Sequence, residues 1–164
     1  MCRLLILGAG QYGMVAEEIA DSMGIFEGIA FLDDNNPAAL GKLCEYEKFR
    51  QEYSCAVAAI GNFEMRMQLI GRLTETGFEV PVLIHKSAYV SPSAVIGTGS
   101  FIEPMAVVHT AARVGKGCIV SSGTVINHNA VVGDGCHLNC CTVVRSTATV
   151  PAGTVSDYGQ ILGR

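Results

Sequence analysis

The chain has 164 residues, of which 16% are charged and 49% are hydrophobic, and its formal net charge at pH 7 is −4. This composition is too apolar for a disordered chain, and no apolar run is long enough to span a membrane. No basic cluster exists, which argues against a nucleic-acid partner. Residues 1–7 are apolar but lead into glycines without a cleavage-site pattern, so we interpret them as a buried strand and expect a cytoplasmic protein.

The chain has seven cysteines, and no two of them form a CxxC pair. We interpret them as buried or half-buried free thiols in a reducing compartment. A zinc site made of Cys136, His137, Cys140 and Cys141 is an alternative that we reject, because strand geometry would point these side chains in several directions. We therefore expect no metal site.

The first half of the chain predicts alternating strands and helices. Val15, Ile19 and Met23 would share one face of the first helix, and Asn62 can cap a later one. The predicted elements are a strand over 4–7, a helix ending at Gly24, a strand over 28–32, a short helix over 45–53, a strand over 55–60, a helix from Asn62 through Leu73 before Gly77, and a strand near 80–83. This order is typical of a βαβ fold with a parallel sheet.

The motif Gly8-Ala9-Gly10-Gln11-Tyr12-Gly13 lies between the first strand and the first helix, where GxGxxG indicates a phosphate site. Asp33 and Asp34 close the second strand, where a carboxylate could hold a ribose or a base. Only about 80 residues precede the next domain, so half of a dinucleotide fold is present, which favours a nucleotide-linked ligand over NAD. The alternative is a tight strand-to-helix turn that binds no ligand.

The second half is an internal repeat of six residues. Every sixth position from Ile84 to Val150 holds Ile, Leu or Val, and the position two residues before each is small from Ala88 to Ala148. Residues i−2 and i of a strand point to the same side, so each repeat predicts one flat face of a three-sided coil. We expect an N-terminal Rossmann-like βαβ half-fold in residues 1–82, followed by a left-handed parallel β-helix in residues 83–164, with about four stacked coils.

The outward positions of this β-helix form columns of residues eighteen apart in the sequence. Two columns are almost entirely apolar: Tyr89, Val107, Val125 and Val143 form one, and Phe101, Ile119, His137 and Val155 form the other. A soluble monomer rarely displays such stripes. We therefore expect other subunits to cover them, and three-fold symmetry suits a three-sided prism.

Among the four histidines, His128 and His137 lie nine residues apart on one predicted coil, beside the expected subunit groove. Imidazole is the natural general base at neutral pH, so this pair is the strongest candidate for chemistry. His109 shares a column with Asn127 and Arg145, and an isolated surface histidine usually has no catalytic role.

Several segments together resemble a known family. They are residues 5–13, Phe31-Leu32-Asp33-Asp34, Ala59-Ile60-Gly61-Asn62 with Arg66, residues 83–90, and residues 125–137 with Asn127-His128-Asn129. They resemble the bacterial hexapeptide acetyltransferases of the NeuD/PglD type, which acetylate sialic acid or nucleotide-linked amino sugars in glycan biosynthesis. The resemblance covers almost the whole chain.

The resemblance implies a homotrimer with an N-terminal nucleotide-sugar domain, and acetyl-CoA bound as co-substrate between adjacent β-helices. It places the catalytic residues at His128 and Asn129 and an acetyl-CoA contact at His137. It places the contacts to the sugar substrate at Gly8, Gly10, Gln11, Tyr12, Gly13, Asp33, Asp34, Gly61 and Asn62. The implied reaction moves acetyl from acetyl-CoA to an amine or hydroxyl of the sugar.

This chain departs from the family pattern in three places. Asn129 stands where the family usually has Glu, and Tyr12 stands where it often has His. The six-residue register ends with Val150, because Ser156 fills the next slot. These departures support a second hypothesis, a non-catalytic nucleotide-sugar-binding or scaffold trimer with a truncated acetyl-CoA site.

Overall fold

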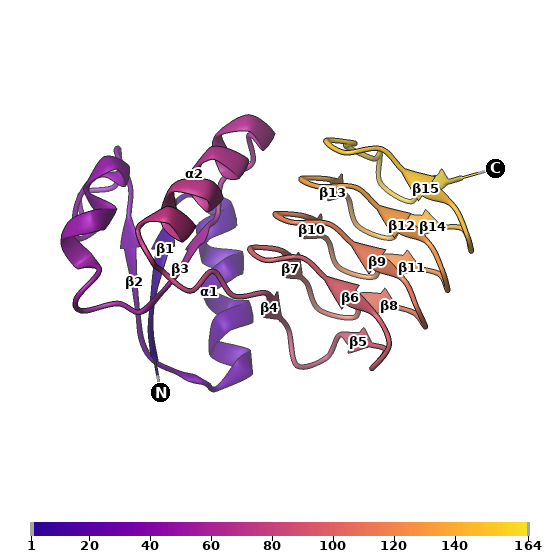
Figure 1. Ribbon diagram of the computed structural model, residues 1–164, viewed down its shortest axis with the longest axis horizontal. Helices are drawn as coiled ribbons and strands as arrows, with labels where there is room; N and C mark the ends of the chain where they lie inside the picture. Colours follow the sequence, from indigo (N-terminus) through magenta and orange to yellow (C-terminus); the bar gives the residue numbers. More distant parts are fainter. Residues whose placement is uncertain (1, 164) are drawn as a thin grey trace. The chain divides into compact units, whose positions relative to one another are not determined.

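The computed structural model describes residues 2–163, and the chain divides into two compact units, Met1–Pro81 and Val82–Arg164. The first unit has a parallel three-stranded sheet in the order β2-β1-β3 with two α-helices (Figure 1). Its elements are β1 (Cys2–Leu7), α1 (Gln11–Met23), β2 (Phe26–Leu32), the 3₁₀ helix η1 (Leu43–Phe49), β3 (Cys55–Ala58) and α2 (Phe63–Glu75). The expected Rossmann-like order of strands and helices is confirmed. No helix among the described residues combines the length and the hydrophobicity needed to cross a membrane.

The ends of the two α-helices follow from local residue chemistry. Gly24 ends α1 in the left-handed conformation at φ +64°, and the Asn62 side chain caps α2 by accepting a hydrogen bond from the Met65 N–H at 2.8 Å. The buried face of α1 is centred on Gly13, Ala16, Ile19 and Ala20, whereas Val15 and Met23 are half-buried. Small residues therefore form most of this face, which lets the helix lie close to the sheet.

The strand predicted near residues 80–83 is wrong. Glu79 makes one isolated bridge to Cys55, and Leu83 belongs to the first strand of the second unit. Pro81 has no backbone N–H to donate to a neighbouring strand, so it interrupts the ladder at this point.

The second unit is a left-handed parallel β-helix of two-residue strands (Figure 1). Its three walls are the sheets β13-β10-β7-β4, β16-β14-β11-β8-β5 and β15-β12-β9-β6. The strands are β4 (Leu83–Ile84), β5 (Tyr89–Val90), β6 (Val95–Ile96), β7 (Phe101–Ile102), β8 (Val107–Val108), β9 (Arg113–Val114), β10 (Ile119–Val120), β11 (Val125–Ile126), β12 (Val131–Val132), β13 (His137–Leu138), β14 (Val143–Val144), β15 (Thr149–Val150) and β16 (Ile161–Leu162). Paired residues are eighteen apart, as in Val125 with Val143.

The inward positions of the repeat form the core of this unit. Val108, Ile126 and Val144 lie on successive coils and are fully buried, as the six-residue register predicts. Corner residues with positive φ recur at the same period, and Asn129 is one of them at φ +58°. At another corner position a Cβ on Gly115 would lie 2.6 Å from the Asp134 backbone nitrogen, so glycine is required there by the close approach of two coils.

Two expectations about the β-helix are wrong. The register continues beyond Val150: Ser156 points inward and is 2% exposed, its Oγ accepts the Asn139 N–H at 2.8 Å, and Leu162 packs against the core. A polar side chain is tolerated at this inward slot because its hydrogen bonds are satisfied. The second stripe is only partly displayed: Phe101 and Ile119 are fully buried, whereas Val155 is 66% exposed.

Candidate active site

His128 stands on the corner between β11 and β12, with its side chain exposed. The coils on either side fix the backbone of this corner. The Asn129 N–H donates to the Thr110 carbonyl at 3.0 Å, and the His128 carbonyl accepts the Thr147 N–H at 3.1 Å. The frame is therefore rigid without help from the His128 side chain, which is left available for chemistry.

Two side chains make polar or ring contacts with the His128 imidazole among residues 2–163. The Asn129 Nδ2 lies 3.1 Å from His128 Nδ1, and the His109 and His128 rings form a T-shaped pair with centroids 6.3 Å apart. Neither of the ion pairs in this part of the chain involves His128, so no carboxylate neutralises the ring. An amide nitrogen donates to an unprotonated Nδ1, whereas turning the amide by half a rotation presents Oδ1 to an Nδ1–H and leaves the Nε2 lone pair free.

His137 lies in β13, on a different wall from β11. Its N–H donates to the Thr154 carbonyl at 2.8 Å, and its carbonyl accepts the Ser156 N–H at 3.0 Å. Along the coil, β12 and a further corner separate it from His128. The two histidines predicted to act together are therefore held at different positions on the perimeter of one coil.

The three glycines of the predicted phosphate loop have different reasons to be glycine. Gly8 has φ +110°, and a Cβ on Gly13 would lie 2.2 Å from the Gly8 carbonyl oxygen. The fold itself requires both. Gly10 has φ −79°, and a Cβ there would meet nothing within 4 Å. Gly10 is the N-cap of α1, where glycine is a favoured residue, but no contact within the fold requires it. The open space there would let a ligand approach the backbone closely.

Asp33 ties this loop to the end of β2. Its Oδ2 accepts the Ala9 N–H at 2.7 Å, and its Oδ1 accepts the N–H groups of Asn35 at 2.8 Å and Asn36 at 3.0 Å. These hydrogen bonds, led by the one from Ala9, hold the pKa of the Asp33 carboxyl below its ordinary value. Most of the hydrogen-bonding capacity of this carboxylate is therefore used by the protein itself.

A pocket of about 310 Å³ opens beside Asp33. Asp34 lines it as an exposed side chain whose Oδ1 accepts the Leu43 N–H at 3.0 Å. The remaining lining residues are Asp33, Asn35, Asn36, Pro37, Ala39, Gly41 and Lys42. The pocket lies at the carboxyl end of β2, where ligands of parallel sheets bind.

The other predicted substrate contacts surround the same edge of the sheet. Gln11 is exposed and Tyr12 half-buried at the start of α1, while Gly61 and Asn62 are exposed after β3. Sequence reasoning assigned no structural role to Arg66, which is fully buried and donates to the carbonyls of Ile60 at 2.7 Å and Gly61 at 2.9 Å. An arginine one turn inside an amphipathic helix could have indicated these hydrogen bonds to the preceding loop.

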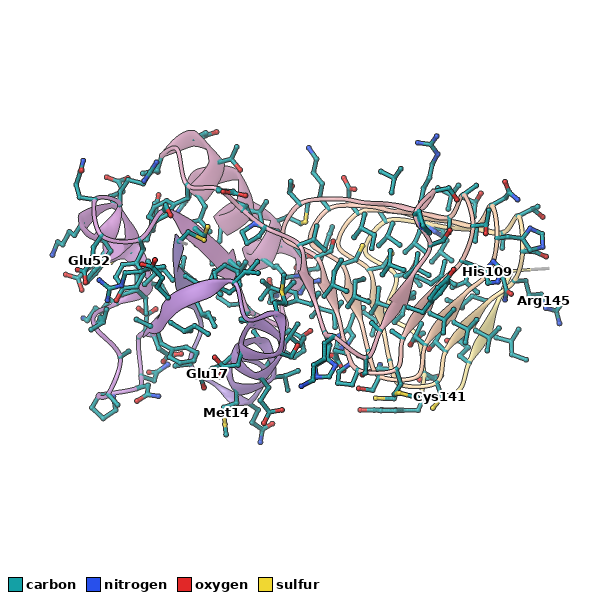
Figure 2. The ribbon with its side chains drawn as sticks, turned by 90° about the horizontal axis from the view of Figure 1, so that it is seen from below. Met14, Glu17, Glu52, His109, Cys141 and Arg145 are labelled. Atoms are coloured by element: carbon teal, nitrogen blue, oxygen red, sulfur yellow. The ribbon has the colours of Figure 1, made fainter. Side chains whose placement is uncertain are left out.

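Within residues 2–163, no group of three or more His, Cys, Asp or Glu residues is placed to hold a metal ion. In the rejected zinc cluster, the Cys136 thiol is buried and donates to the Pro151 carbonyl at 3.1 Å, whereas Cys141 is exposed. Figure 2 shows His109 and Arg145 on one side of the β-helix and Cys141 on another.

Comparison with known proteins supports the fold assigned to both units. A family model described as the PglD N-terminal domain matches residues 3–73. The acetyltransferase domain of PglB from Neisseria gonorrhoeae FA1090, solved in complex with acetyl coenzyme A, is 30% identical; the match covers 96% of this chain and 88% of that chain, with a TM-score of 0.81.

Two further solved structures share the fold at lower identity. PerB from Caulobacter crescentus, in complex with CoA and GDP-perosamine, is 24% identical with a TM-score of 0.82, over 99% of this chain and 89% of that chain. WeeI from Acinetobacter baumannii AYE is 16% identical with a TM-score of 0.68, over 99% of this chain and 95% of that chain.

Proposed function

Because this chain belongs to the PglD-like family of acetyl-CoA-dependent sugar acetyltransferases, we propose that it acetylates an amine or hydroxyl of a nucleotide-linked amino sugar or a sialic-acid-like sugar in bacterial glycan biosynthesis. The observation that carries the proposal at the level of residues is the exposed His128 imidazole, held at Nδ1 by the Asn129 amide. A base with one nitrogen engaged and the other facing outward is arranged for proton transfer.

In the proposed reaction the acceptor nitrogen or oxygen attacks the thioester carbonyl of acetyl-CoA. His128 Nε2 takes the proton from the acceptor, while Asn129 Oδ1 accepts the Nδ1–H and so keeps the required tautomer. The new bond to the acetyl carbon forms, the carbon–sulfur bond breaks, and the departing thiolate receives the proton. His137 contacts the acetyl-CoA and steadies the thioester or its developing oxyanion.

The Rossmann-like unit supplies the proposed nucleotide site. The open space at Gly10 and the first turn of α1, with Gln11 and Tyr12, would receive the phosphates. Asp34 in the pocket, with Gly61 and Asn62 after β3, would contact the rest of the nucleotide sugar. The role that best fits Asp33 is to position the loop, because its oxygens already accept three backbone N–H groups.

We further propose a homotrimer in the cytoplasm. The outward column Tyr89, Val107, Val125 and Val143 continues with Ile161, and its end members Tyr89 and Ile161 are 56% and 58% exposed. Val125 lies in β11, which leads into the His128 corner, so a copy covering this column would border the catalytic residue. The cysteines are all free thiols, as suits a reducing compartment.

The proposal is tested by acetyl-CoA turnover with nucleotide-linked amino sugars and sialic acids as acceptors. We expect one acceptor class to be acetylated, and we expect His128→Ala to lower kcat by about 10²–10⁴-fold with the unfolding transition unchanged. His85→Ala, which removes an imidazole held at 2.8 Å from Ser87, is the matched control.

Two outcomes would contradict this assignment. Full activity of His128→Ala would remove His128 as the base. If calorimetry showed binding of the nucleotide sugar but none of coenzyme A, the non-catalytic scaffold would replace the acetyltransferase.

A further inference from the structure

We propose that His109 is a positioning residue for His128, an inference that rests on the proposed role of His128 as the general base. The two rings lie 6.3 Å apart between centroids with an interplanar angle of 67°, which is the edge-to-face geometry favoured by aromatic pairs. His109 follows β8, one coil before His128, and its side chain is exposed (Figure 2).

The contact is diagonal and depends on the residue between the two rings in the stack. The residue directly in register with His109 on the next coil is Asn127, not His128. The Asn127 side chain turns along the stack, because its Nδ2 donates to the Val144 carbonyl at 2.9 Å. With Asn127 engaged there, the His109 ring is the one aromatic ring that contacts the His128 imidazole within residues 2–163.

The backbone of His109 is held as firmly as that of His128. Its N–H donates to the Ile126 carbonyl at 2.9 Å, and its carbonyl accepts the Ala112 N–H at 3.1 Å. A ring that starts from a fixed backbone can act as a stop for a neighbouring side chain. His109 therefore presents a defined surface to His128 from the preceding coil.

Asn129 alone fixes one atom of the His128 ring. A single contact at Nδ1 lets the imidazole swing about that point, whereas a second contact from His109 on the ring restricts the direction of Nε2. Positioning of this kind contributes to catalysis because the base must point at the acceptor proton.

His109 is a weaker candidate for the base itself. Within residues 2–163, its ring has no hydrogen bond that would select a tautomer, whereas His128 has Asn129 at Nδ1. A general base is normally oriented by a third group. The geometry therefore makes His128 the base and His109 its support.

Three substitutions at this position separate ring packing from other roles. We expect His109→Ala to lower kcat about tenfold with the KM for acetyl-CoA nearly unchanged, because the loss affects the orientation of the base rather than binding. His109→Phe keeps a ring without nitrogens and should recover kcat to within about threefold of the wild type. His109→Lys places a fixed cation beside the imidazolium and should lower kcat more than Ala does.

The controls distinguish failure of this inference from failure of the proposed function. Thermal unfolding should be unchanged in all three variants, and His109→Ala should have no further effect in the His128→Ala background. If Phe is as impaired as Ala, or if Ala retains the wild-type kcat while His128→Ala is inactive, His109 does not position His128. If His128→Ala is itself fully active, the proposed base is wrong and the His109 inference is overturned with it.

Discussion

The His128 corner of the β-helix and the glycine loop of the Rossmann-like unit satisfy their backbone hydrogen bonds in different ways. At the His128 corner of the β-helix, backbone groups pair with backbone groups of neighbouring coils, such as Asn129 N–H with Thr110 and Thr147 N–H with His128. In the Rossmann-like unit, side chains do this work: Asp33 accepts the Ala9 N–H, and Arg66 donates to the Ile60 and Gly61 carbonyls.

This difference predicts how functional substitutions will behave in each unit. The His128 and Asn129 side chains hydrogen-bond to each other rather than to the backbone, so replacing His128 should change catalysis and leave stability alone. Polar side chains around the nucleotide loop hydrogen-bond to the loop backbone, so their replacement should lower stability as well as binding. Gly10 is the exception, because a side chain there meets no steric clash and ligand binding can be tested with little structural cost.

The largest effect is expected from the glycine loop. Gly13→Ala places a methyl group 2.2 Å from the Gly8 carbonyl oxygen and should destabilise the protein by about 2–3 kcal/mol. Gly10→Ala has open space and a permitted φ, and the weaker N-cap preference of alanine offsets its lower entropy in the unfolded chain, so its unfolding free energy should change by less than about 1 kcal/mol. Its affinity for the nucleotide sugar should nevertheless fall about tenfold or more, since the methyl group occupies the proposed phosphate space.

Urea denaturation measures the stability part of this pair, and isothermal calorimetry with the nucleotide sugar measures the binding part. Normal binding by Gly10→Ala would mean that the loop is a turn without a ligand. Equal stability losses for the two variants would break the contrast between glycines required by the fold and the one that is not.

A smaller effect is expected from Asp33→Asn. The pKa of Asp33 is lowered from its ordinary value of 3.8 in the folded state, so its ionised form stabilises the protein above that value, and this contribution is lost as the pH falls through the folded pKa. At pH 7 the substitution should cost about 1 kcal/mol, a figure reduced for the partial exposure of the carboxylate.

Urea denaturation at several pH values checks this prediction. The gap between Asp33→Asn and the wild type should be largest at neutral pH and should close at acidic pH below 3.8. Asp34→Asn keeps an Oδ1 that can accept the single Leu43 N–H, so it is the control and should have the smaller effect. A gap that does not change with pH would mean that the charge of Asp33 is not what holds the loop.

The β-helix could be predicted from the sequence to the level of single inward residues. The six-residue period alone decides which side chains point inward, and Val108, Ile126 and Val144 lie inside as that period requires. The rule failed at Ser156, because a pattern of aliphatic residues does not reveal that Thr142 and Asn139 satisfy a buried hydroxyl. It also failed for Phe101, an outward position of the repeat that is nevertheless fully buried.

The candidate site could be predicted in position but less well in its contacts. The register and the family resemblance put His128 on a corner and Gly10 in the loop, where the structure has them. The engagement of Asp33 by the Ala9 N–H could not be predicted, because it depends on the path of the loop after β2. The contact between His109 and His128 could not be predicted from the sequence either, since the residue in register with His109 is Asn127.

The smallest expected effect is a gain at Asn129, the residue that departs most clearly from the family pattern. A carboxylate at this position accepts the Nδ1–H of His128 in either orientation and also stabilises the imidazolium, which the neutral amide does less well. The backbone there has φ +58°, a conformation that Asp tolerates nearly as well as Asn. We therefore expect Asn129→Asp to raise kcat about threefold without a change in unfolding free energy.

Steady-state kinetics on Asn129→Asp and Asn129→Gly measure this directly. Glycine keeps the left-handed backbone and removes the amide, so its kcat should fall about tenfold if the contact to His128 orients the base. If the Gly variant instead matches the wild type and the Asp variant shows no gain, Asn129 serves only the positive φ of its corner. The β-helix would then hold His128 through its backbone and His109 alone, and the His109 variants should show correspondingly larger losses.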